Sequence, residues 1–194
     1  MKHHTTQALF NYWTRKRGRH RAPVRSDIDP ADIRRILADT FILTADFVNE
    51  IRVRLAGTRV CALFARELKG TPFVQLWDLA GRVRIRELAA TVAEEANPVV
   101  AGVAARTAEG SHADLELLLL PLYHRGRLRV RLLGVLTPLV VPYWLGTEHI
   151  TTLALGTTRH LGGAIALTDA PSFAKAAPEA GRPRLTVHDG GRKD

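Results

Sequence analysis

The stretch of residues 40–70 constrains the fold of this chain more than any other part of its sequence. Residues 41–44 are β-formers, a polar turn follows, and residues 51–55 alternate apolar side chains with arginines. Gly57 then breaks the strand, and the next residue is placed to cap a helix with an apolar side over 60–64. The stretch therefore predicts a hairpin that leads directly into short helical segments, which narrows the choice of fold.

Downstream, the pattern stays helical and then changes to strand periodicity. Asp78 is a good N-cap for a longer helix over about residues 79–96, and Pro98 ends it. Three β-rich segments follow, separated by turns that contain glycine: 99–107, 112–123 and 127–139. Together with the first hairpin they predict a meander in one sheet.

The turn near Gly110 gives a check on strand pairing. A hairpin that turns there places Arg106 opposite Asp114, a favourable cross-strand charge pair. We therefore expect antiparallel pairing and an α+β fold with a single antiparallel sheet of about five strands, two leading and three trailing. Helices are expected on one face, and an N-terminal helix is added to them.

The two ends of the chain are predicted to extend a central domain over 38–145. A helix over residues 5–17 carries Leu9, Tyr12 and Trp13 on one side, which we expect to be covered by the domain or by a second subunit. The N-terminal extension is assigned to residues 1–37. Residues 146–194 are read as a C-terminal extension that is disordered beyond about 162, and 151–161 form either a further strand or an amphipathic piece.

Composition limits the class of protein. The chain has 194 residues, 46% of them hydrophobic and 24% charged, which is typical of a globular protein with a sizeable core. No apolar run approaches the roughly 20 residues that cross a bilayer. The single cysteine, Cys61, suits a reducing compartment, and we expect a cytoplasmic protein without membrane contact.

The formal net charge of +9 raises a nucleic-acid alternative. The basic residues are dispersed, with some concentration at 15–21 and 125–131, and the sequence carries no helix-turn-helix spacing, zinc ligands or aromatic RNA-binding signature. The favoured interpretation of the charge is therefore a solvated basic surface. A basic nucleic-acid-associated protein that uses dispersed arginines is kept as the alternative function.

A ligand pocket between the sheet and the long helix is the main candidate site. Its predicted walls are apolar by position: Leu55, Phe64, Phe73, Trp77, Val92, Val103 and Leu117. Small residues on the helix and on the first trailing strand leave room for a cavity or for close helix–sheet packing. The sequence does not separate a pocket from a closed core.

Several sequence blocks, taken in order, resemble the PAS-like family of single-module proteins common in alphaproteobacteria. They are DIDP at 27–30, RLAGT at 54–58, ELKG at 67–70 and LPL at 120–122, and the resemblance covers about residues 9–145. It implies a five-stranded antiparallel sheet whose two leading and three trailing strands flank a helical stretch. PAS modules commonly sense small molecules, light or redox state, or mediate protein contacts and dimerisation, and usually are not enzymes by themselves.

The best-known PAS cofactors do not fit the residues. Haem-binding modules are expected to offer an axial histidine near the long helix, but residues 58–96 contain none, and His112 reads as a strand histidine beside a turn. Photoactive flavin modules flank a reactive cysteine with Asn, Arg and Gln, whereas Cys61 has apolar neighbours and reads as a core residue. We expect neither haem nor covalent flavin photochemistry, and the cofactor stays unassigned.

No catalytic residue and no metal site is predicted. The serines lack a nucleophile-elbow context, the histidines are scattered, and metal-ligand spacing is absent. The sequence therefore favours a non-enzymatic PAS-type sensory or protein-interaction module in signalling, with an unknown small-molecule ligand, that acts through a separate signalling partner. Homodimerisation is expected through Leu9, Tyr12 and Trp13.

Overall fold

The computed structural model describes residues 1–45, 50–123 and 130–162. Residues Met1–Gly163 form one compact unit. Its helices are α1 (His4–Arg17), α2 (Thr58–Leu63) and α3 (Leu79–Glu95), with 3-10 turns at Arg25–Asp27, Pro30–Ile33, Leu37–Asp39 and Phe73–Leu76. Its strands are β1 (Thr40–Ala45), β2 (Arg52–Ala56), β3 (Val99–Thr107), β4 (His112–Leu122), β5 (Val130–Pro138) and β6 (Ile150–His160). The predicted disorder beyond 162 lies outside the described residues.

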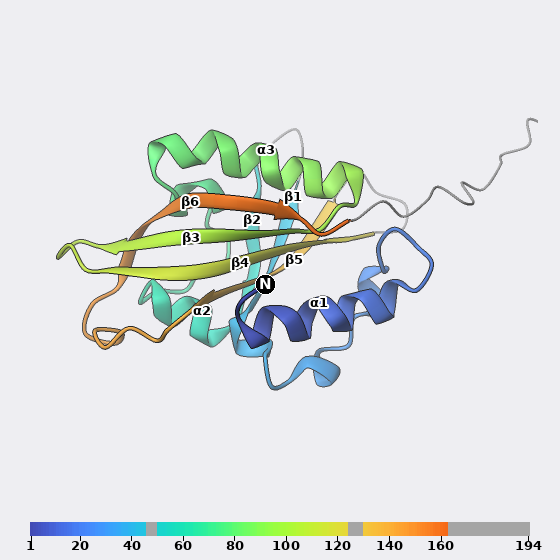
Figure 1. Cartoon of the computed structure of the whole chain (residues 1–194), viewed down its shortest axis with the longest axis horizontal. Helices are drawn as coiled ribbons and strands as arrows, with labels where there is room; N and C mark the ends of the chain where they lie inside the picture. Colours follow the sequence, from blue (N-terminus) through green and yellow to red (C-terminus); the bar gives the residue numbers. More distant parts are fainter. Residues whose placement is uncertain (46–49, 124–129, 163–194) are drawn as a thin grey trace, which may run out of the picture. The chain divides into compact units, whose positions relative to one another are not determined.

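The strands form a single antiparallel sheet in the order β2-β1-β5-β4-β3-β6 (Figure 1). This confirms the α+β class, with six strands rather than about five. The sixth is β6, which comes from the segment read as a strand or an amphipathic piece. It pairs with β3 and forms one edge of the sheet.

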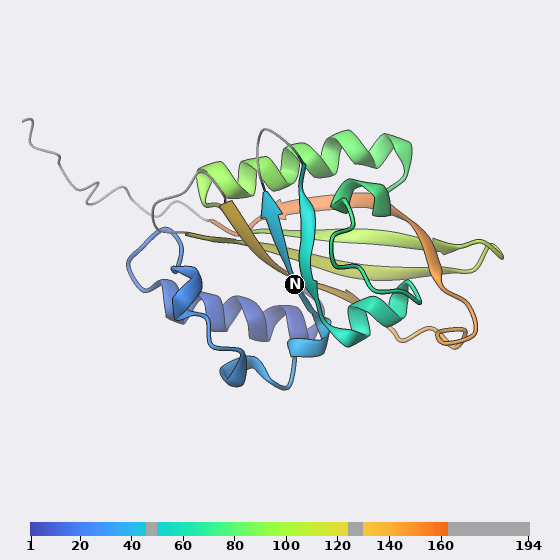
Figure 2. The same cartoon turned by 180° about the vertical axis from the view of Figure 1, so that it is seen from behind.

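Both faces of the sheet are covered by helix. α3, α2 and the Phe73–Leu76 turn pack on one face, and α1 with the first 3-10 turns packs on the other (Figures 1 and 2). The consequence is plain in β4, where every side chain from Leu115 to Leu122 is buried. Alternate residues of that strand enter different cores, so its sequence is almost entirely apolar from Leu115 to Leu122, interrupted only by Glu116.

Local sequence signals place the helices correctly. Asp78 caps α3, because its Oδ1 accepts a hydrogen bond from the Gly81 N–H at 2.6 Å. Asp29 caps the turn that begins at Pro30, where its side chain accepts from the Ala31 N–H. That turn is a single 3-10 turn, and its Ile33 is buried under α1.

The predicted pairing of Arg106 with Asp114 is wrong by two residues. Arg106 lies opposite His112, and Asp114 lies opposite Ala104. The reason is that the turn is centred one residue earlier than expected, because the Thr107 N–H bonds to the Ser111 carbonyl and the Gly110 N–H bonds back to the Thr107 carbonyl. Gly110 has a φ of 92°, which suits glycine at this turn.

Candidate functional sites

Six of the seven predicted pocket residues meet in the core between the sheet and α3. They belong to one continuous apolar cluster, and each is at most 3% exposed: Phe64, Phe73, Trp77, Val92, Val103 and Leu117. The sequence therefore located this region of the fold correctly. Its side chains are close-packed against one another, as in an ordinary protein core.

Leu55, the seventh predicted wall residue, lies outside this core and is 48% exposed. The register of β1 and β2 shifts between Ile42 and Leu43, so Leu55 pairs with Ile42 while Val53 pairs with Leu43. A bulge of this kind breaks the two-residue alternation of a strand. Val53 consequently faces the core, and Leu55 does not.

An aromatic row crosses the core and ends on an indole without a partner. The Phe41 and Phe73 rings stack at 5.7 Å, and Phe73 meets Trp77 edge to face at 5.8 Å. Trp77 is 1% exposed, and its Nε1 has no hydrogen-bond acceptor within the described part of the chain. Leaving a buried donor unpaired costs about 1–3 kcal/mol, so this N–H is a polar group open to an acceptor.

The three predicted dimer residues are covered by the chain's own sheet. Leu9, Tyr12 and Trp13 are 0%, 4% and 1% exposed and form part of the second core, under α1. The Trp13 indole donates to the Pro121 carbonyl at 2.8 Å, and the Tyr12 hydroxyl accepts from the Asp29 N–H at 2.9 Å. They are therefore core residues of the folded chain and not an exposed dimer surface.

A buried carboxylate holds the start of α1 on the sheet. Glu116 of β4 is 5% exposed, and its two oxygens accept hydrogen bonds from the Lys2 N–H at 2.7 Å and the His3 N–H at 2.9 Å. Burial alone raises the pKa of this carboxyl. The two hydrogen bonds, with the nearby Met1 ammonium, outweigh burial and set the pKa of Glu116 below its ordinary value.

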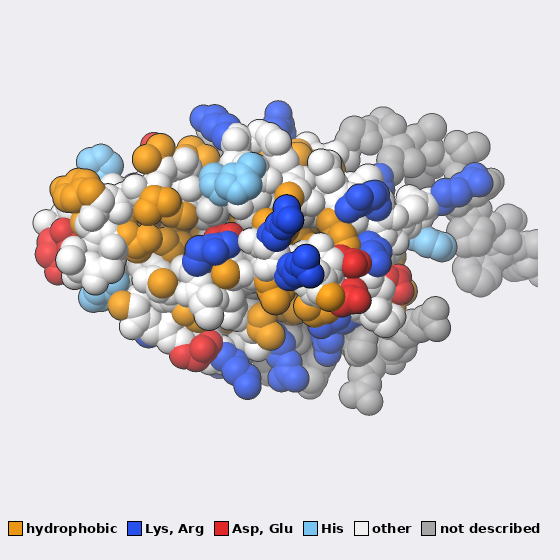
Figure 3. Space-filling view, turned by 90° about the horizontal axis from the view of Figure 1, so that it is seen from below, with side chains coloured by type: hydrophobic (Ala, Val, Ile, Leu, Met, Phe, Trp, Pro, Cys, Tyr) orange, Lys and Arg blue, Asp and Glu red, His pale blue; other side chains and the backbone are white. Residues whose placement is uncertain are grey.

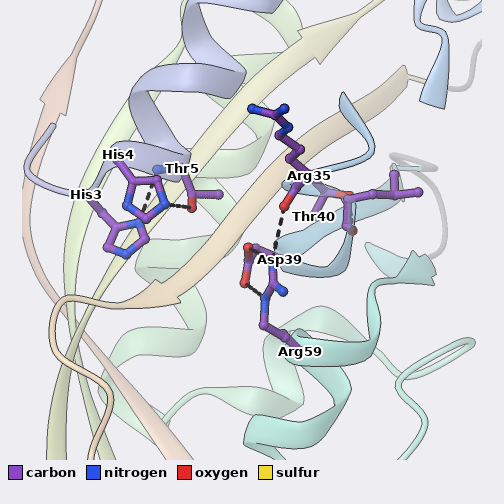
Figure 4. Close-up of polar contacts among 8 residues, drawn as sticks. His3, His4, Thr5, Arg35, Asp39, Thr40 and Arg59 are labelled. Atoms are coloured by element: carbon purple, nitrogen blue, oxygen red, sulfur yellow. Dashed lines mark hydrogen bonds and ion pairs between the residues drawn. The ribbon is translucent and has the colours of Figure 1, made fainter. Parts of the chain in front are cut away.

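A second set of polar contacts lies close to the start of α1 (Figure 4). The His3 and His4 rings lie 4.4 Å apart, and burial, followed by the neighbouring His4, lowers the pKa of His3. Asp39 accepts a hydrogen bond from the Arg59 Nε at 2.7 Å and a second one from the same guanidinium, which joins the Leu37–Asp39 turn to α2. These groups have structural partners, and no set of three His, Cys, Asp or Glu side chains in the described ranges is placed to hold a metal ion.

The loop between β5 and β6 carries three highly exposed large apolar side chains. Val140, Val141 and Tyr143 are 79%, 73% and 95% exposed. Beside them lies an open groove of about 440 Å³, lined by residues from the start of β4 and from this loop: His112, Ala113, Asp114, Leu139, Val140, Pro142, Tyr143 and Trp144. Sequence reasoning missed this surface, although an apolar and aromatic run directly after the predicted strand 127–139 is a signal for it.

The fold and these sites define a class of protein: an α+β module with two packed cores, one unpaired buried indole and an exposed apolar groove. The family model described as PAS domain matches residues 1–137, and the chain belongs to the PAS domain family. Membership indicates a sensory or interaction module. A search of curated proteins found no match. Across the described ranges, no helix is both long and apolar enough to cross a membrane.

Proposed function

We propose that this chain is a non-enzymatic PAS-type sensory and protein-interaction module that signals by contact with a separate partner. The observation that carries the sensory half is the Trp77 N–H, which is buried between the sheet and α3 with no acceptor among the described residues. Its surroundings are otherwise apolar. The matching ligand is a small, mostly apolar molecule with one hydrogen-bond acceptor, and the close-packed side chains around the indole would have to move apart to admit it.

We propose a cytoplasmic location for the protein, because its single cysteine, Cys61, is a free thiol.

A homodimer also remains a proposal. Because Leu9, Tyr12 and Trp13 are buried in their own chain, a dimer that used them would have to exchange α1 between two copies. Sedimentation velocity of the full chain over a concentration series measures this, and a monomer at every concentration would remove the dimer from the proposal.

Native mass spectrometry of the freshly purified full chain tests the ligand. We expect an added mass from a small molecule in the wild type and a lower occupancy in Trp77→Phe, because phenylalanine fills most of the same space but offers no N–H. Trp13→Phe is the matched control: it removes an indole N–H on the opposite face of the sheet, so occupancy should not change. A bare mass in the wild type, with no ligand gained after incubation with a metabolite extract, contradicts the sensory half.

A further inference from the structure

We define the β5–β6 surface as Val140, Val141, Tyr143 and the groove beside them. The loop that carries it is fixed to the rest of the domain by hydrogen bonds and by a buried side chain. The Leu139 N–H donates to the Asp114 carbonyl at 2.8 Å, and Trp144 is 4% exposed and anchors the loop in the core. The Glu148 carboxylate accepts from the Thr107 hydroxyl at 2.7 Å and the Ser111 hydroxyl at 3.1 Å. The loop is thus attached to both strands of the β3–β4 hairpin. A partner that binds it would therefore lose little free energy in ordering the loop.

The groove combines a mostly apolar lining with the polar side chains of His112 and Asp114. Ala113, Pro142 and Tyr143 line it, and its volume of about 440 Å³ suits one or two bulky side chains better than a whole folded element. Asp114 lies on the groove wall and is exposed. Within the described part of the chain its carboxylate takes part in no ion pair or side-chain hydrogen bond. An apolar group with a cation next to it complements this pair of features.

The charge around the groove is weakly acidic, unlike that of the chain. Residues 107–123 and 132–158 contain no lysine or arginine, in a protein of net charge +9. Their exposed or half-buried carboxylates are Glu109, Asp114 and Glu148, because Glu116 is buried under α1, and Arg106 lies opposite His112 at the edge of this end. Figure 3 shows orange side chains gathered toward the left end, where Figure 1 places the β5–β6 loop, while most of the blue side chains lie over the rest of the face. An acidic, apolar end repels phosphate groups and attracts a basic partner.

We infer that the β5–β6 surface docks a basic, apolar peptide segment of a partner protein. A bulky apolar side chain of that segment occupies the groove beside Tyr143 and Trp144, and an adjacent Arg or Lys pairs with Asp114. Contiguous exposed apolar surface on a folded protein commonly marks such contacts. This inference rests on the proposed function only in the claim that the chain acts through a separate partner.

Fluorescence anisotropy with the full chain tests the surface. The probe is a short fluorescein-labelled peptide in which Leu and Trp alternate with Arg, and two further peptides replace Arg by Glu or Leu and Trp by Ser. We expect saturable binding of the first peptide only, weakened about tenfold by Tyr143→Ser, because truncating a central aromatic anchor is among the costliest interface changes. Asp114→Asn should weaken it about two- to fivefold, as expected for an exposed ion pair, and reduce its salt dependence.

Leu79→Ser is the matched control, because Leu79 on α3 has the same 79% exposure as Val140 and lies far along the chain from the groove. It should leave the affinity unchanged. Equal affinity in the wild type, Tyr143→Ser and Asp114→Asn overturns the inference, since the peptide then binds elsewhere. Self-association of the wild type that Tyr143→Ser abolishes, with no peptide competition, also overturns it and makes the surface an interface between copies.

The ligand experiment and the peptide experiment can each give a negative result without affecting the other. Ligand occupancy reports on the core beside Trp77, whereas peptide binding reports on the β5–β6 loop, and the variants used in one lie outside the site read by the other. Loss of peptide binding with retained ligand occupancy removes this inference and leaves the sensory proposal standing. The reverse result leaves the docking surface standing.

Discussion

Glu116 is the residue on which the placement of α1 depends most directly. Its two oxygens each serve one backbone N–H, from Lys2 and His3, in a buried position. We expect Glu116→Gln to lower the free energy of unfolding by about 1–2 kcal/mol, because glutamine offers one acceptor oxygen and turns an amide donor toward the second N–H. Urea unfolding measures the loss. Glu94→Gln, on the exposed side of α3, should stay within about 0.5 kcal/mol of the wild type, and an equal effect of both variants would contradict the assignment.

Single residues were predictable where one local pattern decides their environment. Phe73, Trp77 and Val92 were expected between the sheet and the long helix because they are apolar by position, and they lie there. Leu55 was misplaced, because a bulge is a property of two paired strands and leaves no mark in one strand's alternation. Glu116 was overlooked, although a carboxylate inside an otherwise apolar strand is a signal that a buried donor lies opposite it.

At the scale of elements, β5 depends on a glycine beneath an aromatic ring. A Cβ on Gly134 would lie 2.3 Å from the tip of Phe41 and 2.8 Å from the Leu118 carbonyl oxygen. Phe41 is 3% exposed and stacks on Phe73, so it has little room to move. We expect Gly134→Ala to destabilise the fold by about 1–3 kcal/mol, the usual cost of overpacking a core.

Gly102→Ala, in strand β3, is the control for Gly134→Ala. Its added Cβ would meet nothing closer than 3.7 Å, from the Thr157 hydroxyl. The substitution should therefore be neutral or stabilise by up to about 1 kcal/mol, because alanine restricts the unfolded chain. Thermal unfolding of the two variants should rank them clearly. A Gly134→Ala variant as stable as Gly102→Ala would show that the Phe41 ring does not hold its place.

The elements themselves were largely readable, because caps and periodicity are local. Asp78 gave the start of α3, and the apolar segments between glycine-containing turns gave β3 and β4 close to their observed limits. The hairpin register was wrong, since a two-residue change in loop length moves every pair. The strand β6 was left open because its exposed threonines carry little apolar pattern, and its pairing with β3 is a long-range contact.

At the scale of the whole molecule, the sequence showed which surfaces are apolar but not what covers them. The apolar side of α1 was recognised, yet a second subunit and the chain's own sheet were equally consistent with it. The structure buries that side on β4 and β5, where Trp13 meets the Pro121 carbonyl. The reverse happened at Val140 and Tyr143, which belong to no buried cluster and remain on the surface. Tertiary packing decides both cases, and one strand or helix does not encode it.

Acid should loosen the attachment of α1 in two stages, because two groups at its start have lowered pKa values in the folded chain. His3, whose ordinary pKa is 6.5, contributes stability that is complete above that value and is lost as the pH falls through its lower folded pKa. Glu116, whose ordinary pKa is 4.5, does the same in a more acidic window. The other titratable groups that face His3 or Glu116 are His4, Asp39 and the Met1 ammonium. We therefore expect the urea midpoint of the wild type to fall below about pH 6 and to fall again below about pH 4.5.

The two variants separate these stages. His3→Gln should lack the first stage, and Glu116→Gln should lack the second. Parallel pH profiles for the wild type and Glu116→Gln would show that this carboxylate does not couple protonation to the seating of α1 on the sheet.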